Sequence, residues 1–110
     1  MLAKFLLLFV TLWVTINFMI KSFKHKGLEN FFYTGSKKGI IPTHAKKLGK
    51  LLDRLNAAAE LRDLNFPGSN FHTLTGNYKG MYSISVSGNW RLIFRFKEAN
   101  IYDIDCIDYH

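Results

Sequence analysis

The sequence predicts an α+β domain in which N-terminal helices pack on a small antiparallel β-sheet. Apolar residues recur at three- and four-residue steps between residues 48 and 59, which is typical of an amphipathic helix. Three later segments alternate apolar and polar side chains and are separated by short turn sequences, which is typical of a β-meander. Because the helical patterns precede the strands instead of alternating with them, the order of elements favours α+β over α/β.

Size and composition narrow the classes of protein. The chain has 110 residues, enough for one domain, and 48% of them are hydrophobic, so we expect a packed core. Cys106 is the only cysteine, which excludes an internal disulfide and a multi-cysteine zinc cluster and fits a reducing compartment such as the cytoplasm. The net charge of +7 favours a nucleic acid or an acidic protein as partner, and a merely soluble surface is the alternative.

The first 18 residues differ from the rest. Residues 5–20 carry no charge and resemble the core of a signal peptide or a short membrane span, which needs about 20 apolar residues. No small-x-small cleavage site follows them. A third interpretation, which we favour, is a start codon assigned too early, with Met19 as the true start. Residues 1–18 are then a hydrophobic extension and residues 19–110 the domain, and a membrane is a partner only if the extension is translated and retained.

Two helices are expected in the first half of the domain. The alternation from Ile20 to Lys26 first predicts a weak strand at the rim of the sheet, and "KGLENFFYTG" then predicts a short helix that ends at Gly35. The clearest helix follows Pro42, and its apolar stripe consists of Leu48, Leu51, Leu52, Leu55, Ala58 and Ala59. Its charged face, which we interpret as solvated more readily than as a binding site, consists of Lys46, Lys47, Lys50, Asp53 and Arg54.

The second half of the domain is expected to be a loop followed by three strands. The loop is "DLNFPGSNFHTLTGNYKG", and the strands are "MYSISVS", "WRLIFRFK" and "IYDIDCIDYH". In the middle strand Arg91 and Arg95 point outward, opposite the inward side chains of Trp90, Leu92, Phe94 and Phe96. In the last strand Tyr109 points away from the face that carries Tyr102, Ile104, Cys106, Asp108 and His110.

Polar side chains that suit RNA cleavage occur in this second half. His72 lies in the loop before the hairpin, Arg91 and Arg95 share one face of the middle strand, and Asp108 and His110 end the last strand. Each also has an ordinary interpretation, as an exposed loop histidine, a charge at a strand edge, or the polar end of a sheet. The sequence lacks H-E-x-x-H, P-loop, G-x-G-x-x-G and G-x-S-x-G patterns, which argues against a zinc protease, a nucleotide hydrolase, a dehydrogenase and a serine hydrolase.

RNA can be cut without a metal ion when proton-transfer groups and a cation surround the scissile phosphate. A base removes the proton of the 2′-hydroxyl, an acid protonates the leaving 5′-oxygen, and positive groups hold the growing phosphoryl charge. Histidine suits proton transfer near pH 7, arginine can hold two phosphoryl oxygens, and tyrosine can stack on a base. The four histidines are scattered and the cysteine is single, so we expect neither a metal nor another cofactor.

The segments "MIKSFKHKGL", "FHTLTG" and "YSISVSGNWRLIFRF" and the closing "DYH" together resemble the HigB-type toxins of the RelE/ParE superfamily. The resemblance covers essentially all of residues 19–110, and "SGNWR" combined with a terminal "DYH" is its most specific part. It implies a RelE-like fold, related to that of microbial ribonucleases, and a toxin of a bacterial type II toxin–antitoxin system. Such a toxin is a ribosome-dependent mRNA endoribonuclease that inhibits translation, and a HigA-type helix-turn-helix antitoxin neutralises it.

The resemblance also implies functional positions. The catalytic positions fall on His72, Arg91, Asp108, Tyr109 and His110. His72 and His110 would be the proton-transfer pair, with either as the base, and Arg91 would stabilise phosphoryl charge. Tyr109 would orient or stack the substrate, and Asp108 would fix His110 or share in the acid–base work.

Two further basic residues are candidates to bind RNA. The family commonly has a lysine three residues after the loop histidine, but Thr75 stands there in this chain, so Lys79 is a candidate substitute. Arg95 is a candidate only from strand alternation. Two other functions stay open: a ParE-like toxin that is not a nuclease, and a basic RNA- or protein-binding module without catalysis.

Overall fold

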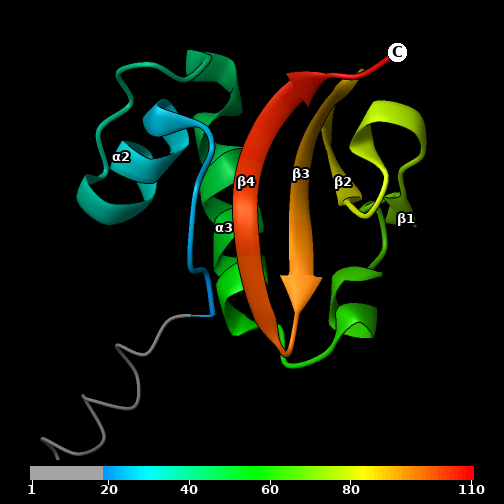
Figure 1. Cartoon of the computed structure of the whole chain (residues 1–110). Helices are drawn as coiled ribbons and strands as arrows, with labels where there is room; N and C mark the ends of the chain where they lie inside the picture. Colours follow the sequence, from blue (N-terminus) through cyan, green and yellow to red (C-terminus); the bar gives the residue numbers. More distant parts are fainter. Residues whose placement is uncertain (1–18) are drawn as a thin grey trace, which may run out of the picture.

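The computed structural model describes residues 19–110, and the hydrophobic extension, residues 1–18, lies outside the described residues. A four-stranded antiparallel sheet has the strand order β1-β2-β3-β4, and the helices cover one of its faces (Figure 1). The α+β prediction is therefore confirmed. The elements in chain order are α2 (Lys26–Thr34), η1 (Pro42–His44), α3 (Ala45–Ala57), η2 (Leu61–Leu64), β1 (His72–Thr73), η3 (Gly76–Tyr78), β2 (Tyr82–Ser87), β3 (Trp90–Lys97) and β4 (Asn100–Asp108).

The segment before α2 runs along the free edge of β4, as Figure 1 shows. Ile20 and Phe23 form isolated parallel bridges with Ile101 and Ile104. The predicted strand at the rim of the sheet thus has the right place, but it is reduced to two bridges because α2 begins at Lys26. This contact ties the start of the described chain to its last strand.

Local hydrogen bonds fix both ends of α2. At its start, Nδ1 of His25 accepts a hydrogen bond of 3.1 Å from the backbone N–H of Leu28. At its end, Gly35 adopts the left-handed conformation (φ 79°) and its N–H donates to the carbonyl of Phe31, which confirms the predicted C-cap. Gly27 permits a close approach, since a Cβ there would lie 2.5 Å from the carbonyl oxygen of Gly39.

Helix α3 buries the predicted leucine stripe. Leu48, Leu51, Leu52 and Leu55 are all at most 2% exposed, and they pack against the helix-facing side of the sheet. The helix ends at Ala57 and Ala58 is its cap. The predicted stripe therefore extends too far, because Ala59 is exposed and already belongs to the turn that follows.

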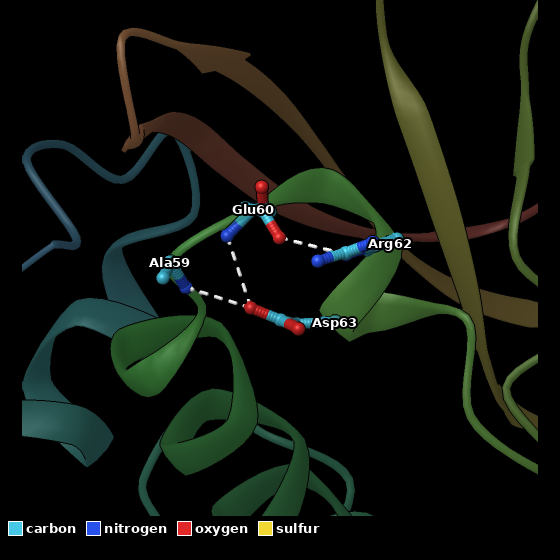
Figure 2. A network of polar contacts seen from close by, with 4 residues as sticks. All are labelled: Ala59, Glu60, Arg62 and Asp63. Carbon is cyan, nitrogen blue, oxygen red and sulfur yellow. Dashed lines mark hydrogen bonds and ion pairs between the residues drawn. The ribbon is translucent and has the colours of Figure 1, made fainter.

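A compact turn redirects the chain from α3 toward the sheet, and Figure 2 shows its polar contacts. Oδ2 of Asp63 accepts hydrogen bonds of 3.0 Å from the backbone N–H groups of both Ala59 and Glu60. Glu60 and Asp63 form a capping box around η2, and Arg62 contacts the Glu60 carboxylate at 2.7 Å. These bonds hold η2 in place while Leu64 enters the core.

The sheet has a helix-facing side and an open side. The predicted inward residues of β3 lie on the helix-facing side: Trp90, Leu92, Phe94 and Phe96. A smaller apolar cluster lies on the open side, where Tyr78, Ile107 and Tyr109 pack against Leu74, Met81 and Ile93. The open side is where the outward-pointing polar side chains of the strands gather.

A β-bulge changes one predicted face of β4. The register shifts between Ile93, which pairs with Asp105, and Arg95, which pairs with Tyr102. Asp103 in the bulge has φ 55°. The prediction that Tyr102 shares the face of Ile104 and Cys106 is wrong, because the extra residue turns Ile101 into the core instead.

Candidate active site

The candidate catalytic residues lie toward the end of the sheet where β3 begins and β4 ends, but they do not share one face. Tyr109 packs in the apolar cluster of the open side, whereas Asp108 pairs with Trp90 of the helix-facing side. The strand register places His72 of β1 opposite Ser83 of β2, and Ser83 opposite Ile93 of β3. Arg91 pairs with Ser85 on one side and with Ile107 on the other. Residues paired across a sheet project from the same face, so His72 and Arg91 both belong to the open side.

Arg91 is held in a fixed position. Its Nη1 donates hydrogen bonds to Oγ of Ser83 at 3.1 Å and to the carbonyl oxygen of Asn70 at 3.3 Å. Ser83 is fully buried, so its hydroxyl is a rigid support. Within residues 19–110 the Nη2 and Nε atoms of Arg91 have no partner, and they are free to meet a phosphate.

His72 lies in a short strand and not in the predicted free loop. Its backbone pairs with Ser83, because the segment before β2 folds back as the two-residue strand β1. The imidazole is exposed and, in the described part of the chain, makes no hydrogen bond or ion pair. The ring is therefore open to solvent beside the support of Arg91.

The end of the chain is ordered by two contacts. The backbone N–H of Tyr109 donates to the carbonyl of Asn89 at 2.8 Å, and the Tyr109 ring meets Tyr78 edge-on, with centroids 6.0 Å apart. Asp108 and His110 lie together, with Oδ1 and Nδ1 3.2 Å apart. The prediction that these two project together and away from Tyr109 is confirmed.

The two candidate RNA-binding residues lie farther along the open side. Nε of Arg95 lies 3.4 Å from Oδ2 of Asp103, and its guanidinium passes close to Gly80, where a Cβ would lie 3.1 Å from Nη1. Lys79 is exposed and follows η3, next to Gly80. Arg95 and Lys79 thus border the turn that contains Tyr78, at a distance from the support of Arg91.

The predicted residues form two groups. One group joins His72 and Arg91 through Ser83, and the other is the Asp108–His110 pair at the chain end. In residues 19–110 no hydrogen bond or ion pair joins the two groups, and Tyr109 packs in the apolar cluster of the open side.

Sequence reasoning missed the residues that support Arg91. Ser83 has the alternation of an outward residue, and strand pairing could have placed it beside Arg91. Asn70 gives no comparable signal, because its carbonyl reaches Arg91 only through a loop in which Asn70 itself has φ 47°. Tyr78, which contacts Tyr109, was also missed because it lies in an apparently plain turn.

Three other findings bear on the chemistry. Burial, and then the charge of Asp105, raises the pKa of the Cys106 thiol to about 11, so this thiol is protonated at neutral pH. Among residues 19–110, no three His, Cys, Asp or Glu side chains are grouped closely enough to hold a metal ion. The same part of the chain contains no helix that is long and apolar enough to span a membrane.

The arrangement of helices on one face of a four-stranded antiparallel sheet is a fold known from solved structures. The YoeB–YefM complex from Staphylococcus aureus has this fold: its matching chain gives a TM-score of 0.54 with 21% identity, over 83% of this chain and 94% of that chain. A family model described as the RelE-like toxin of type II toxin–antitoxin system HigB matches residues 21–110. The chain therefore belongs to the HigB family of type II toxins, as its sequence motifs imply.

Two relatives support the same assignment. Endoribonuclease HigB from Proteus vulgaris is 37% identical over 92 residues, which cover 84% of this chain and all of the relative. Toxin HigB-1 from Vibrio cholerae serotype O1 is 39% identical over 83 residues, which cover 74% of this chain and 87% of the relative. The matches span both the helices and the sheet that carries the candidate site.

Proposed function

We propose that this toxin is a ribosome-dependent endoribonuclease that cuts messenger RNA in the A site and so inhibits translation in the cytoplasm. The name of the Proteus vulgaris relative supports nuclease activity. The observation that carries the proposal is the fixed Arg91, which is anchored on Ser83 beside the exposed ring of His72. A cation and a proton-transfer group side by side on an open surface are what phosphodiester cleavage requires.

The proposed reaction uses the RNA's own 2′-hydroxyl as nucleophile. One of His72 and His110 removes its proton, the 2′-oxygen attacks the adjacent phosphorus, and the other histidine protonates the leaving 5′-oxygen. Arg91 holds the charge that grows on the phosphoryl oxygens. Asp108 orients His110 through their 3.2 Å contact, and Tyr109 stacks on or orients a base. The products are a 2′,3′-cyclic phosphate and a 5′-hydroxyl.

The ribosome supplies the alignment that this surface lacks. His72 and His110 are exposed, and in residues 19–110 no hydrogen bond or ion pair holds the two groups of site residues together. Holding the substrate in a reactive geometry can lower a barrier by about 7–11 kcal/mol in well-oriented systems. A messenger RNA held in the A site is already ordered, so the toxin needs to add only its chemical groups.

Cleavage of messenger RNA on programmed ribosomes tests the proposal. We expect His72→Ala and Arg91→Ala each to lower the rate by roughly a hundredfold or more, because each removes a proton-transfer or charge-stabilising group. Arg62→Ala is the matched control, since Arg62 is exposed, lies in η2 outside the sheet, and has its side chain paired with Glu60. A chain without Tyr109 and His110 should be inactive but folded.

The chemical groups at the ends of the cleaved RNA give an independent check. A 5′-hydroxyl and a cyclic phosphate should be found, and cleavage should continue in EDTA when pre-assembled complexes retain enough magnesium to keep the subunits joined. Products with a 5′-phosphate, or full activity without Tyr109 and His110, would contradict the mechanism. Complete lack of cleavage by the wild-type toxin would favour a ParE-like or purely binding function instead.

The proposed partner is a HigA-type helix-turn-helix antitoxin. A groove of about 470 Å³ lies between α2 and α3, and its lining includes Phe31, Gly49 and three lysines, Lys37, Lys46 and Lys50. Three cations face a single acid in this groove, Asp53, so an acidic segment of the antitoxin is its complementary occupant. Because the helices cover the side of the sheet opposite His72 and Arg91, an antitoxin held here leaves these two residues uncovered and acts by blocking entry to the ribosome.

Charge reversal tests the antitoxin groove. We expect Lys46→Glu combined with Lys50→Glu to weaken antitoxin binding by at least about tenfold, because both would then repel an acidic segment. Cleavage on ribosomes should be unchanged. Lys97→Glu is the control, since Lys97 is an exposed lysine at the end of β3. Equal loss of binding in the control, or no loss in the double variant, would place the antitoxin elsewhere.

A further inference from the structure

A second hollow lies on the open side of the sheet, farther along β3 than Arg91. It has a volume of about 170 Å³ and is bounded by η3, β3 and the bulge of β4. Met81 and Ile93 are apolar members of its lining, and Tyr78 lies beside them. Tyr78 also contacts Tyr109, so the hollow adjoins the chain end that the proposed mechanism uses.

The polar members of the lining can recognise the edge of a base. The amide of Asn77 offers both a donor and an acceptor. Asp103 holds Nε of Arg95 at 3.4 Å, which leaves the Nη groups of Arg95 as donors and positions a carboxylate as acceptor next to them. Donors and acceptors around an apolar and aromatic surface are the usual environment of an unstacked RNA base.

A cation stands at the outer rim of the same hollow. The backbone N–H of Lys24 donates to the carbonyl of Ile104 at 2.9 Å, which fixes Lys24 against the edge of β4. Arg95 and Asp103 neutralise each other, so Lys24 gives the lining a net positive charge. No ion pair engages the Lys24 ammonium anywhere in residues 19–110, and it is therefore placed to meet a phosphate.

We propose that this hollow is a nucleotide subsite, which binds one ribonucleotide of the RNA next to the bond that is cut. The base lies against Tyr78 and Ile93 with its edge toward Asn77 and the Arg95–Asp103 pair, and its phosphate meets Lys24. This inference rests on the proposed function for its role in cleavage, but binding of a nucleotide does not require catalysis. The subsite gives Arg95 a defined part in substrate selection.

Amide NMR spectra of the full chain test occupancy of the hollow. The four ribonucleoside 5′-monophosphates and inorganic phosphate are titrated separately at equal concentrations. We expect at least one nucleotide to shift the amide signals of Asn77, Tyr78 and Asp103 in a saturable manner, while inorganic phosphate does not. Equal shifts with phosphate would reduce the hollow to an anion site, and the absence of saturable shifts with every nucleotide would overturn the proposal.

Matched variants separate this inference from the proposed function. Asn77→Ala and Lys24→Ala should each weaken nucleotide binding by about tenfold, which is the usual effect of losing one charged or well-aligned polar contact. Asn30→Ala and Lys97→Ala, in α2 and at the end of β3, are the controls and should bind as the wild type does. If Asn77→Ala and Lys24→Ala also bind nucleotide as the wild type does, the proposed subsite is wrong.

Kinetics on ribosomes then assign the role. Variants in the hollow should raise KM or change the preferred cleavage sequence with kcat preserved, whereas His72→Ala should lower kcat and still bind the nucleotide. A wild-type toxin that binds nucleotide here but cuts no RNA would refute the proposed function and leave the binding site intact. A toxin that cuts RNA with normal KM and sequence preference in Asn77→Ala and Lys24→Ala would refute the subsite alone.

Discussion

Cys106 is the residue whose chemistry the fold changes most clearly. It lies on the helix-facing side of β4, and burial together with Asp105 raises its pKa from 9.0 to about 11. We expect the folded protein to react with iodoacetamide roughly a hundredfold more slowly at pH 8 than the urea-unfolded chain, since a shift of this size leaves that much less thiolate. Mass spectrometry at timed intervals measures both rates.

The same pKa shift predicts how the stability of the fold changes with pH. The neutral thiol is the favoured form in the fold, so its contribution is complete below pH 9 and declines as the pH rises from about 9 to 11. A Cys106→Ala variant should lack this part of the decline. Native and unfolded chains that react equally fast at pH 8 would show that the thiol is not protected.

At the scale of single residues, the sequence predicts where the candidate site residues lie better than it predicts the groups that hold them in place. Arg91, Tyr109 and the Asp108–His110 pair lie where alternation placed them. The Asn70 carbonyl that helps to hold Arg91 could not be predicted, because a backbone oxygen in an irregular loop has no signature in the side-chain pattern. A prediction from alternation also assumes an even register, which does not hold for Tyr102.

Among the elements, the turn between β3 and β4 holds backbone strain. Lys97 pairs with Asn100, so Glu98 and Ala99 form a two-residue loop, and their φ values are 52° and 64°. Positive φ at both central positions suits Asn-Gly and is unfavourable for these residues. We expect Glu98→Asn with Ala99→Gly to stabilise the fold by about 1 kcal/mol and to raise Tm by a few degrees.

Thermal unfolding followed by circular dichroism checks this prediction. Gly88→Ala is the opposite control, because Gly88 has φ 56° in the other hairpin turn and a side chain there adds strain. An unchanged or lower Tm in the Asn-Gly variant would show that the present turn carries no strain. Cleavage activity should stay unchanged, since the turn lies at the end of the sheet opposite the candidate site.

Elements were easier to predict than their exact boundaries. Period-3.6 and period-2 patterns identified α3 and the three long strands, since each buries one face. The two-residue strand β1 was not predicted, because it is too short to show alternation and forms only by pairing with β2. The bulge in β4 was not predicted for a related reason, since its position depends on how β4 pairs with β3.

For the molecule as a whole, the central prediction is that residues 19–110 fold without the first 18. The fold already includes Met19, whose N–H donates to Oδ1 of Asn56 at 3.1 Å, and Ile20 is 2% exposed in the core. We expect the shorter chain to be soluble, to unfold cooperatively, and to be as active on ribosomes as the full chain. Comparing amide NMR spectra and melting curves of the two forms measures this.

The control for this prediction is a chain that begins at Lys24. It loses the bridges of Ile20 and Phe23 to β4 and should unfold at a lower temperature than the 19–110 form. If the 19–110 form is insoluble while the full chain inserts into membranes, the interpretation of an early start is wrong. Mass spectrometry of the native N-terminus decides which form the cell makes.

The pairing of the first described segment with β4 has a consequence for synthesis of the toxin. Ser22 and Asp103 are 81 positions apart, yet Oγ of Ser22 accepts a hydrogen bond from the N–H of Asp103. A contact this distant in sequence cannot form on a nascent chain until β4 has left the exit tunnel, and such topologies fold slowly. We therefore expect a nascent chain to complete its fold, and so to become able to carry out the proposed cleavage, only after β4 has been made.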